Sequence, residues 1–354
     1  MDLIYRVKPG DTIATVAFQH GVRPLDILLL NPSLYSERSY LPVGSEIRIP
    51  ERTGERMQEM IDCDTEFGQK QLEDMIADFE KNGVKIDIIG ASVMKKPLYA
   101  LKVGRGKKEV FYSGGWHANE WHTSKFLAKF VLELARHDKR KKNWYRYQVN
   151  NILNEVTLYC VPLVNPDGVE LVLQGVYDGH PFREEVLKIN KGVERFDHWS
   201  ANIRGVDLNH QWPAGWDKEA EESPQQPWPR HYSGKAPLTE PEALAIYHFT
   251  RAHSFEYVLA FHSQGQLIYW GYDGLEPKES EEMVRRLSLV SSYTPVRTAD
   301  SDGGYKDWFI KETGRPGFTI EVGVGTNPLP PSAFAEIWAN NVLLALEGLT
   351  LKLS

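Results

Sequence analysis

Apolar residues recur with two different periods along the chain, and these periods predict where helices and strands lie. Between residues 65 and 81 they fall on one helical face, and Asn82-Gly83 ends that pattern. Further helices are predicted at 121–136, 240–252, 280–291 and 332–351. Strands are predicted at 85–90, 98–103, 109–113, 156–164, 257–262, 266–270 and 317–322. Strands interleaved with long helices predict an α/β domain over residues 65–354, with helices on both faces of its sheet.

Two other stretches carry weaker patterns. Residues 213–238 are rich in Pro, Gly and Trp and are predicted to form an irregular surface loop. Residues 51–64 are charged and poor in aliphatic side chains, so they are predicted to be a linker.

Residues 2–50 form a separate short unit in which the pattern reads strand, helix, helix, strand. A strand is predicted at 4–7, and the turn at Pro9-Gly10-Asp11-Thr12 leads into the first helix. Gly21 ends that helix, and Pro24 opens a second one that closes at Asn31-Pro32. The unit ends with a returning strand at 46–50.

Composition and charge exclude several classes of protein. The chain has 354 residues and a net charge of −7, and no basic block supplies the electrostatics that a nucleic-acid partner needs. No apolar run is long enough to span a membrane. The N-terminus lacks the basic and apolar segments of a secretory signal. We therefore expect a cytoplasmic or spore-associated protein, or a cell-wall protein if a leader was removed.

The two cysteines lie in different contexts, Cys63 in the predicted linker and Cys160 in an apolar run. They are predicted to be free thiols, so any metal must be held by histidine and carboxylate side chains.

His117 and Glu120 are the first residues with metal-binding spacing. They lie three positions apart, directly after the strand predicted at 109–113 and before a helix. This spacing places an imidazole and a carboxylate about one helical turn apart, so both can reach one ion.

The rest of a hydrolytic zinc site follows downstream. Such a site needs three protein ligands and an open position for water. His262 lies at the end of an apolar strand and is predicted to be the third ligand. Glu321 lies within an apolar run, where an unpaired carboxylate would be costly, so it is predicted to act as the general base toward water. Asp207, also in an apolar setting, is predicted to orient a ligand histidine.

Together these residues resemble the zinc carboxypeptidase family, the M14 metallopeptidases, over roughly residues 65–350. The motifs that carry the resemblance are His117-x-x-Glu120, Asn165-Pro166-Asp167-Gly168, Gly205-Val206-Asp207-x-Asn209, His262-Ser263-Gln264, Gly303-Gly304-Tyr305-Lys306-Asp307-Trp308 and Thr319-x-Glu321. The resemblance implies a mixed central sheet flanked by helices and one Zn²⁺ held by His117, Glu120 and His262. It also implies that Asp207 supports the first histidine and that Asn209 helps to hold the terminal carboxylate of the substrate.

Two departures shift the expected substrate. Carboxypeptidases have Asn-Arg where this chain has Asn209-His210, and imidazole cannot grip a C-terminal carboxylate in a bidentate fork. The tyrosine that caps the substrate in the digestive enzymes falls at Ala299. The Asn-His pair and the run at 319–330 resemble the γ-D-glutamyl-diamino acid endopeptidase branch, which cuts peptidoglycan stem peptides between γ-D-Glu and diaminopimelate.

The same resemblance suggests two further roles in substrate binding and catalysis. Lys306 lies where the family sets side-chain specificity, so it is predicted to meet a substrate carboxylate or else to be an exposed surface lysine. The family places an arginine shortly before the Gly-Val-Asp motif to stabilise the negative charge on the carbonyl oxygen. Arg204 is the nearest candidate, and Arg183 and Arg195 are alternatives.

Residues 2–50 resemble a LysM domain through Tyr5-x-Val7-x-x-Gly10-Asp11-Thr12, Asn31-Pro32 and Val43-Gly44-x-x-Ile47-x-Ile49-Pro50. The resemblance implies a small βααβ fold that binds glycans containing N-acetylglucosamine. The sugar-binding loops would include Gly10, Asp11, Thr12, Asn31 and Pro32. Turn and cap chemistry explains these five residues equally well.

Three functions remain open at this point. The first is a zinc peptidase that hydrolyses the γ-D-glutamyl-diaminopimelate bond of stem peptides while its LysM domain holds the glycan. The second is an M14 metallocarboxypeptidase or amidase that acts on other peptides or acyl-amino acids. The third is a glycan-binding protein with a catalytically dead hydrolase domain.

Overall fold

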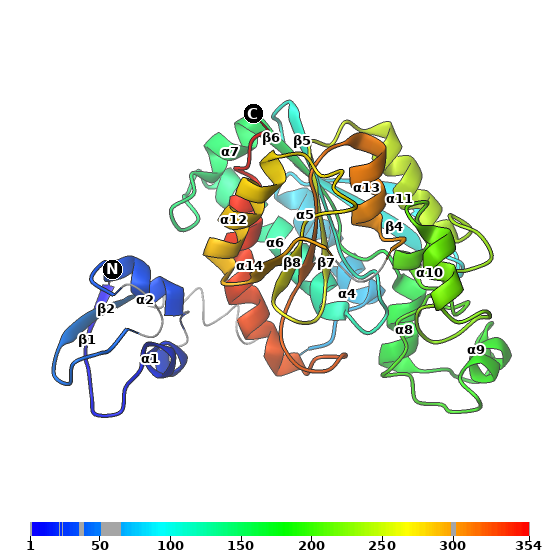
Figure 1. Cartoon of the computed structure of the whole chain (residues 1–354), viewed down its shortest axis with the longest axis horizontal. Coiled ribbons are helices and arrows are strands. Elements are labelled where there is room, and N and C mark those ends of the chain that lie inside the picture. The colour runs from blue at the N-terminus through cyan, green and yellow to red at the C-terminus, as the bar shows by residue number, and fades with distance from the viewer. Residues whose placement is uncertain are drawn as a thin grey trace.

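The computed structural model describes residues 2–20, 22, 24–34, 39–50, 65–298 and 302–353. It contains a two-stranded sheet in the N-terminal unit and an eight-stranded sheet in the larger unit (Figure 1). The linker predicted at 51–64 lies outside the described residues. None of the helices within the described ranges is long and apolar enough to cross a membrane.

The N-terminal unit has the predicted order of strand, helix, helix, strand. Its elements are β1 (Asp2–Arg6), α1 (Ile13–His20), α2 (Pro24–Leu30) and β2 (Glu46–Pro50). β1 and β2 pair antiparallel, with Ile4 opposite Arg48. Ile13, Val16, Ile27 and Ile49 form a small buried core beneath this pair, which confirms the predicted βααβ fold.

The larger unit is built on a mixed sheet in the order β3-β4-β6-β5-β7-β10-β8-β9. Its strands are β3 (Lys85–Ala91), β4 (Pro97–Gly104), β5 (Lys108–Ser113), β6 (Val156–Val161), β7 (Val258–His262), β8 (Leu267–Tyr269), β9 (Thr294–Val296) and β10 (Gly317–Glu321). The central strands β6, β5, β7 and β10 run parallel to one another, whereas β3 and β4 pair antiparallel with their neighbours. β8 pairs antiparallel with β10 and parallel with β9. The predicted mixed sheet is confirmed.

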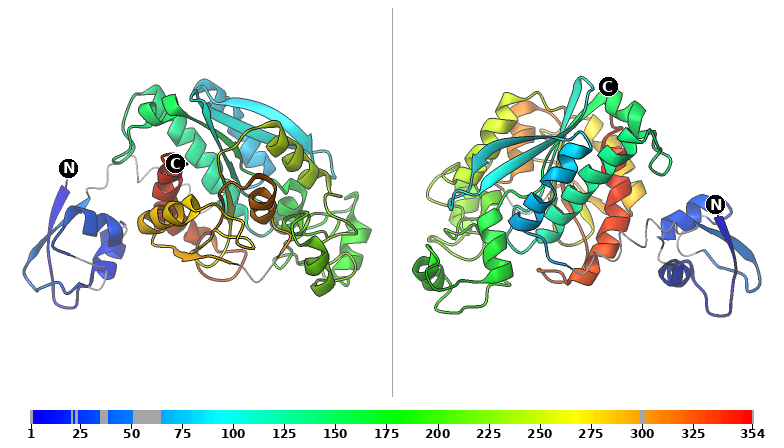
Figure 2. Two further views of the ribbon diagram at one scale, coloured as in Figure 1. Left: turned by 45° about the horizontal axis from the view of Figure 1, so that its top comes forward. Right: turned by 180° about the vertical axis from the view of Figure 1, so that it is seen from behind.

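Helices cover both faces of this sheet, as Figures 1 and 2 show. On one face α6 (Trp121–Lys139), α7 (Val149–Glu155), α12 (Glu279–Ser291) and α14 (Phe334–Gly348) pack in the largest buried core. On the other face α11 (Pro241–Ala252) and α13 (Tyr305–Thr313) pack in a second core. Along β5, Val110 and Tyr112 enter the first core while Phe111 enters the second. A central parallel strand is thus apolar on both sides, which explains its unbroken apolar run.

The remaining helices are short, and several differ from the sequence prediction. The helix predicted at 65–81 divides at Met75 into α4 (Gln69–Asp74) and α5 (Ile76–Lys81). The predicted loop at 213–238 contains a helix, α10 (Trp216–Glu222), so that prediction was wrong for this part. Four others were not predicted, namely α7, α8 (Pro166–Gln174), α9 (Arg183–Ile189) and α13. Helices of seven to nine residues give too few turns for periodicity to reveal them.

Candidate catalytic metal centre

The site forms at the carboxyl ends of the central parallel strands. β7 ends at His262 and β10 ends at Glu321, and these two residues are register partners. β5 runs parallel to β7 and ends at Ser113, and the loop after it delivers His117 and Glu120. The carboxyl edge of a parallel sheet, where successive strands open into loops, is the usual place for a binding site.

The loop that carries His117 is held tightly in place. Gly115 has a left-handed backbone (φ +62°), and a Cβ there would lie 2.3 Å from Ser124 Oγ, so only glycine fits. The Gly115 N–H donates to Thr123 Oγ1 at 2.8 Å. The Asn165 side chain donates to the carbonyls of Trp116 and Ala201, both at 3.1 Å. One amide therefore fastens the metal-binding loop to the segment around residue 201.

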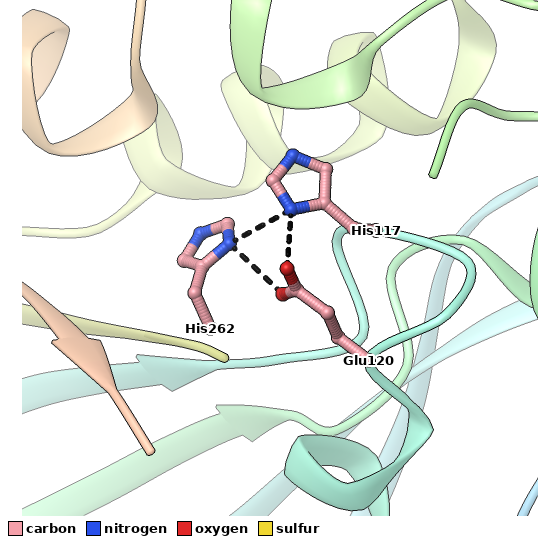
Figure 3. Close-up of side chains that lie close together, drawn as sticks. All are labelled: His117, Glu120 and His262. Carbon is pink, nitrogen blue, oxygen red and sulfur yellow. Dashed lines mark hydrogen bonds and ion pairs between the residues drawn. The ribbon is translucent and has the colours of Figure 1, made fainter. Parts of the chain in front are cut away.

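Three side chains converge at this point (Figure 3). The ligand atoms of His117, Glu120 and His262 lie within 4.8 Å of one another. His117 Nδ1 lies 2.8 Å from Glu120 Oε1, and His262 Nδ1 lies 3.2 Å from Glu120 Oε2. The two Nδ1 atoms are 3.3 Å apart. The structure thus brings together the three residues that sequence singled out as metal ligands.

Asp207 fixes the first histidine from behind. Its Oδ1 lies 3.1 Å from His117 Nε2. The Asp207 side chain is buried, whereas the His117 side chain is partly exposed. A proton on Nε2 then bonds to the carboxylate and leaves the Nδ1 lone pair directed at Glu120 and His262. The predicted orienting role of Asp207 agrees with this geometry.

The charges of the cluster favour a cation at its centre. Burial opposes protonation of His117, but Glu120 and Asp207 more than offset it and raise the pKa of His117 well above its usual value. Burial also opposes ionisation of Glu120, yet His117 and His262 lower the pKa of Glu120 to about 2. Burial lowers the pKa of His262, so its imidazole is neutral, the form that binds metals.

The residues present fit a zinc ion. Glu120 Oε2 is buried and lies 3.2 Å from His262 Nδ1 without a hydrogen bond of good geometry, which is costly unless a cation lies beside it. Two imidazoles and one carboxylate, with an orienting carboxylate behind the first imidazole, are the donor set of a hydrolytic zinc site.

His122, which is close to this pair of ligands in sequence, is a packing residue. It is buried, its Nε2 lies 3.1 Å from the Pro330 carbonyl, and its ring stacks on Trp121.

Glu321 lies at the same pocket with its carboxylate unengaged. It forms no hydrogen bond or ion pair with a described residue, and it is half-buried. Burial and the charge of Glu120 raise the pKa of Glu321 to about 8, although His117 opposes this. A carboxyl group whose pKa lies near neutrality can both take up and release a proton there, which suits proton transfer.

Two of the three clustered ligand residues, His117 and Glu120, border a cavity of about 270 Å³. The residues lining it are His117, Asn119, Glu120, Ser200, Asp207, Arg230, His231, Ser263, Gln264, Tyr269, Glu321 and Asn327. Asn327 donates to the Ser263 carbonyl at 2.7 Å and approaches Glu120 Oε1 at 3.4 Å, so it links two parts of the site. Sequence reasoning assigned no role to Arg230, His231 or Tyr269, because nothing in their spacing connects them to the zinc motifs.

Asn209 and His210 lie next to this cavity but do not line it. The Asn209 side-chain carbonyl accepts from the Tyr305 N–H at 3.2 Å, which caps the start of α13. His210 Nδ1 lies 3.2 Å from Glu219 Oε1 and is shielded from solvent. Asp207, His210 and His231 also have ligand atoms within 4.8 Å of one another. Both oxygens of Asp207 are occupied by protein groups, so this trio offers no free carboxylate oxygen to a second ion.

The structure does not support the predicted roles of Lys306 and Arg204. Lys306 is buried, its ammonium donates to the Gly271 carbonyl at 2.6 Å, and it pairs with Asp307. It therefore stabilises the interior, and neither of its two predicted settings was correct. Arg204 is about half exposed and its guanidinium lies 3.5 Å from Glu240, outside the cavity. Ala299, the position where the digestive enzymes have the tyrosine that caps the substrate, lies outside the described residues.

In the N-terminal unit the polar atoms of two predicted glycan-binding residues hold the fold. Asp11 Oδ2 accepts from the Tyr5 hydroxyl at 2.8 Å and the Lys8 N–H at 2.7 Å. Asn31 exchanges hydrogen bonds with the backbone of Arg48 at 2.7 and 2.8 Å. Gly10, Thr12 and Pro32 are exposed. Glycan binding by these five residues stays a prediction.

Comparisons with known proteins match both units of this chain. A family model described as zinc carboxypeptidase matches residues 70–344, and one described as LysM domain matches residues 5–50. Gamma-D-glutamyl-L-diamino acid endopeptidase 1 of Lysinibacillus sphaericus is 44% identical over 263 residues, which are 74% of this chain and 66% of that protein. The uncharacterized protein YqgT of Bacillus subtilis (strain 168) is 40% identical over 254 residues, 71% of this chain and 68% of YqgT.

The solved structures agree at the level of the fold. Bovine thrombin-activatable fibrinolysis inhibitor, in complex with tick carboxypeptidase inhibitor, superposes with a TM-score of 0.64 at 20% identity. The superposition covers 81% of this chain and 97% of the bovine chain. With a family model that matches most of its length, this chain belongs to the zinc carboxypeptidase family of metallopeptidases and carries an N-terminal LysM domain.

Proposed function

We propose that this enzyme hydrolyses the amide between γ-D-glutamate and a diamino acid in the stem peptides of peptidoglycan. The observation that carries the proposal is His210, which stands where a carboxypeptidase has the arginine that grips a C-terminal carboxylate. His210 is turned toward Glu219 and away from the cavity. The chain matches a relative named for the γ-D-glutamyl-diamino acid bond over 66% of that relative's length, which supports the same assignment.

Different residues of the site have different roles in amide hydrolysis. His117, Glu120 and His262 would hold the zinc ion, and Asp207 would keep His117 in the binding tautomer. A bound zinc ion supplies Lewis acidity, which polarises the amide carbonyl and makes water more acidic. The Glu321 carboxylate takes a proton from water, and the oxygen of that water forms the new bond to the γ-carbonyl carbon.

Glu321 also completes the reaction. The proton that it took returns to the nitrogen of the diamino acid as the C–N bond breaks, so water and amide yield a carboxylate and an amine. This second transfer requires a carboxyl group that neither binds its proton strongly nor releases it at once.

The LysM domain supports a polymeric substrate. We propose that it binds the glycan strands of peptidoglycan and so raises the local concentration of stem peptides at the catalytic domain. This tethering explains why a glycan-binding unit and a peptidase occur in one chain.

Mass spectrometry of a defined stem peptide tests the proposal. The zinc-loaded protein should convert L-Ala-γ-D-Glu-meso-diaminopimelate to L-Ala-D-Glu and diaminopimelate, and a chelator should stop the reaction. An ordinary α-linked peptide, which has no γ-D-glutamyl bond, should remain intact. Cleavage of the ordinary peptide alone would favour another carboxypeptidase or amidase, and zinc-loaded protein that cleaves neither would indicate a binding protein.

A further inference from the structure

Arg230 is the one arginine or lysine among the described residues that line the catalytic cavity. Its side chain is exposed, and it forms no hydrogen bond or ion pair with any residue that the structure describes. A guanidinium is charged at every working pH and carries a planar fork of donors. The cavity therefore presents one permanent cation whose donors are free for a ligand.

The backbone on both sides of Arg230 is fixed. Before it, the Pro229 carbonyl accepts from the N–H groups of Ser200 at 2.9 Å and Ala201 at 3.0 Å. After it, the His231 N–H donates to Asp207 Oδ2 at 3.2 Å, and the Tyr232 carbonyl accepts from the Asp207 N–H at 2.8 Å. The arginine thus projects from a segment that is anchored directly to the carboxylate behind the metal site.

The acidic groups nearby do not neutralise this cation. Asp207 uses Oδ1 for His117 and for the Asn209 N–H, and Oδ2 for the His231 N–H. Glu120 faces the two histidines of the metal site. An unpaired cation beside a catalytic centre is suited to an anionic group of the substrate.

The chemistry of the stem peptide supplies such a group. When D-glutamate is linked through its γ-carboxyl, its α-carboxylate stays free a few bonds from the scissile amide. The diamino acid on the other side also carries a carboxylate next to the nitrogen that is released. An ordinary peptide chain has no free carboxylate at the first of these places, and has one at the second only at its C-terminus.

We propose that Arg230 binds one of the two substrate carboxylates that flank the scissile amide and so contributes to specificity for stem peptides. The inference rests on the proposed function, and it assigns to Arg230 the carboxylate recognition that His210 cannot supply. The Arg230 fork pairs with the two carboxylate oxygens and positions the γ-carbonyl at the metal centre.

A substrate-by-variant cycle tests this role. Three peptides are compared: L-Ala-γ-D-Glu-diaminopimelate, the same peptide with the D-Glu α-carboxylate as a carboxamide, and the same peptide with the flanking diaminopimelate carboxylate as a carboxamide. Arg230→Gln should lower kcat/KM for the parent peptide on the order of 10- to 100-fold, mostly through KM, because a charge-assisted fork is lost. For one of the two carboxamide peptides, the kcat/KM of the wild-type enzyme should be lower by a similar factor. Arg230→Gln should cause no further decrease in kcat/KM for that peptide. That peptide identifies which carboxylate is bound.

Controls separate recognition from loss of structure. Arg230→Lys, which keeps the charge but not the fork, should retain an intermediate kcat/KM on the parent peptide. Arg251→Gln removes an exposed arginine of α11 that pairs with Glu312, and it should leave kcat/KM for all three peptides unchanged. Each variant should bind one zinc ion and unfold at the wild-type temperature.

The other outcomes overturn the proposal in distinguishable ways. An equal loss on all three peptides would place Arg230 at the reacting carbonyl, and no loss on any of them would leave it outside recognition. Either result rejects the carboxylate assignment while the proposed function stands. If zinc-loaded wild-type protein cleaves none of the peptides, the proposed function and this inference both fail.

Discussion

Glu321 and His262 are register partners at the carboxyl ends of the parallel strands β10 and β7. The sheet therefore sets the spacing between the proton-transferring carboxylate and a metal-binding histidine by its own hydrogen-bond ladder. Neither residue needs a flexible loop to reach the other. A change of either side chain should accordingly alter chemistry while the position of its neighbour is kept.

Glu321→Gln should separate catalysis from metal binding. The amide keeps the size of the side chain but cannot accept a proton from water, so kcat should fall by roughly 10²–10⁴-fold. Zinc content, measured by metal analysis of the purified variant, should stay at one ion per chain. Substantial turnover in Glu321→Gln would contradict its role as general base.

Asp207→Asn should weaken the metal site without removing a ligand. The carboxylate that orients His117 is replaced by a neutral amide, so zinc affinity should fall by about 10- to 100-fold. Competition with a chromogenic chelator measures this directly. Asp138→Asn, which changes an acid paired with Arg105 far from the site, is the matched control and should keep wild-type affinity. Equal affinities for Asp207→Asn and wild type would show that His117 needs no support.

Glu242 should make folding stability depend on pH. It is fully buried, its Oε1 accepts from the Val93 N–H at 3.0 Å, and burial raises its pKa to about 7. A folded-state pKa above the unfolded value means that the folded state binds the proton more tightly. Stability is therefore lost as pH rises from about 4.5 to 7.

Glu242→Gln removes this titration and tests it. With zinc present throughout, the variant should be more stable than wild type by about 2–3 kcal/mol at pH 8 and nearly equal at pH 5. Urea unfolding at the two pH values gives the comparison, with the exposed Glu312→Gln as control. The same difference at both pH values would mean that Glu242 does not titrate in this range.

Asp11→Ala should affect the polymeric substrate more than the soluble one. The variant loses the hydrogen bonds from Tyr5 and Lys8 that shape the loop containing Gly10 and Thr12. Retention on insoluble peptidoglycan in a pelleting assay should fall several-fold, while hydrolysis of a soluble tripeptide stays at the wild-type rate. Glu46→Ala changes an exposed acid outside that loop and should not reduce retention. If Asp11→Ala pellets as well as wild type, this loop does not contribute to glycan binding.

The parts of the molecule that sequence predicts well are those with long repeating patterns. The central strands are apolar on both faces, so their runs are unbroken and end close to the observed boundaries. His117 and Glu120 were found because they follow such a strand, and His262 because it ends one. Their convergence in space follows from the parallel arrangement of β5 and β7.

The parts that sequence does not predict depend on contacts between distant segments. Lys306 lies beside a recognisable motif, yet its ammonium turns inward because the Gly271 carbonyl and Asp307 receive it there. Arg230 enters the cavity because its neighbours bond to residues 200–207, a contact that leaves no periodic trace. Arg204 is closer to the Gly-Val-Asp motif in sequence, but Glu240 holds its guanidinium outside the cavity.

The anchoring of residues 228–232 has a consequence for how this pocket can change over evolution. Trp228, Pro229 and Tyr232 are held through their backbone atoms, and the His231 backbone N–H bonds to Asp207. The fold therefore constrains where the side chain at position 230 begins but not which side chain it is. A single substitution there can exchange one substrate preference for another while the metal site and the proton-transferring carboxylate remain in place.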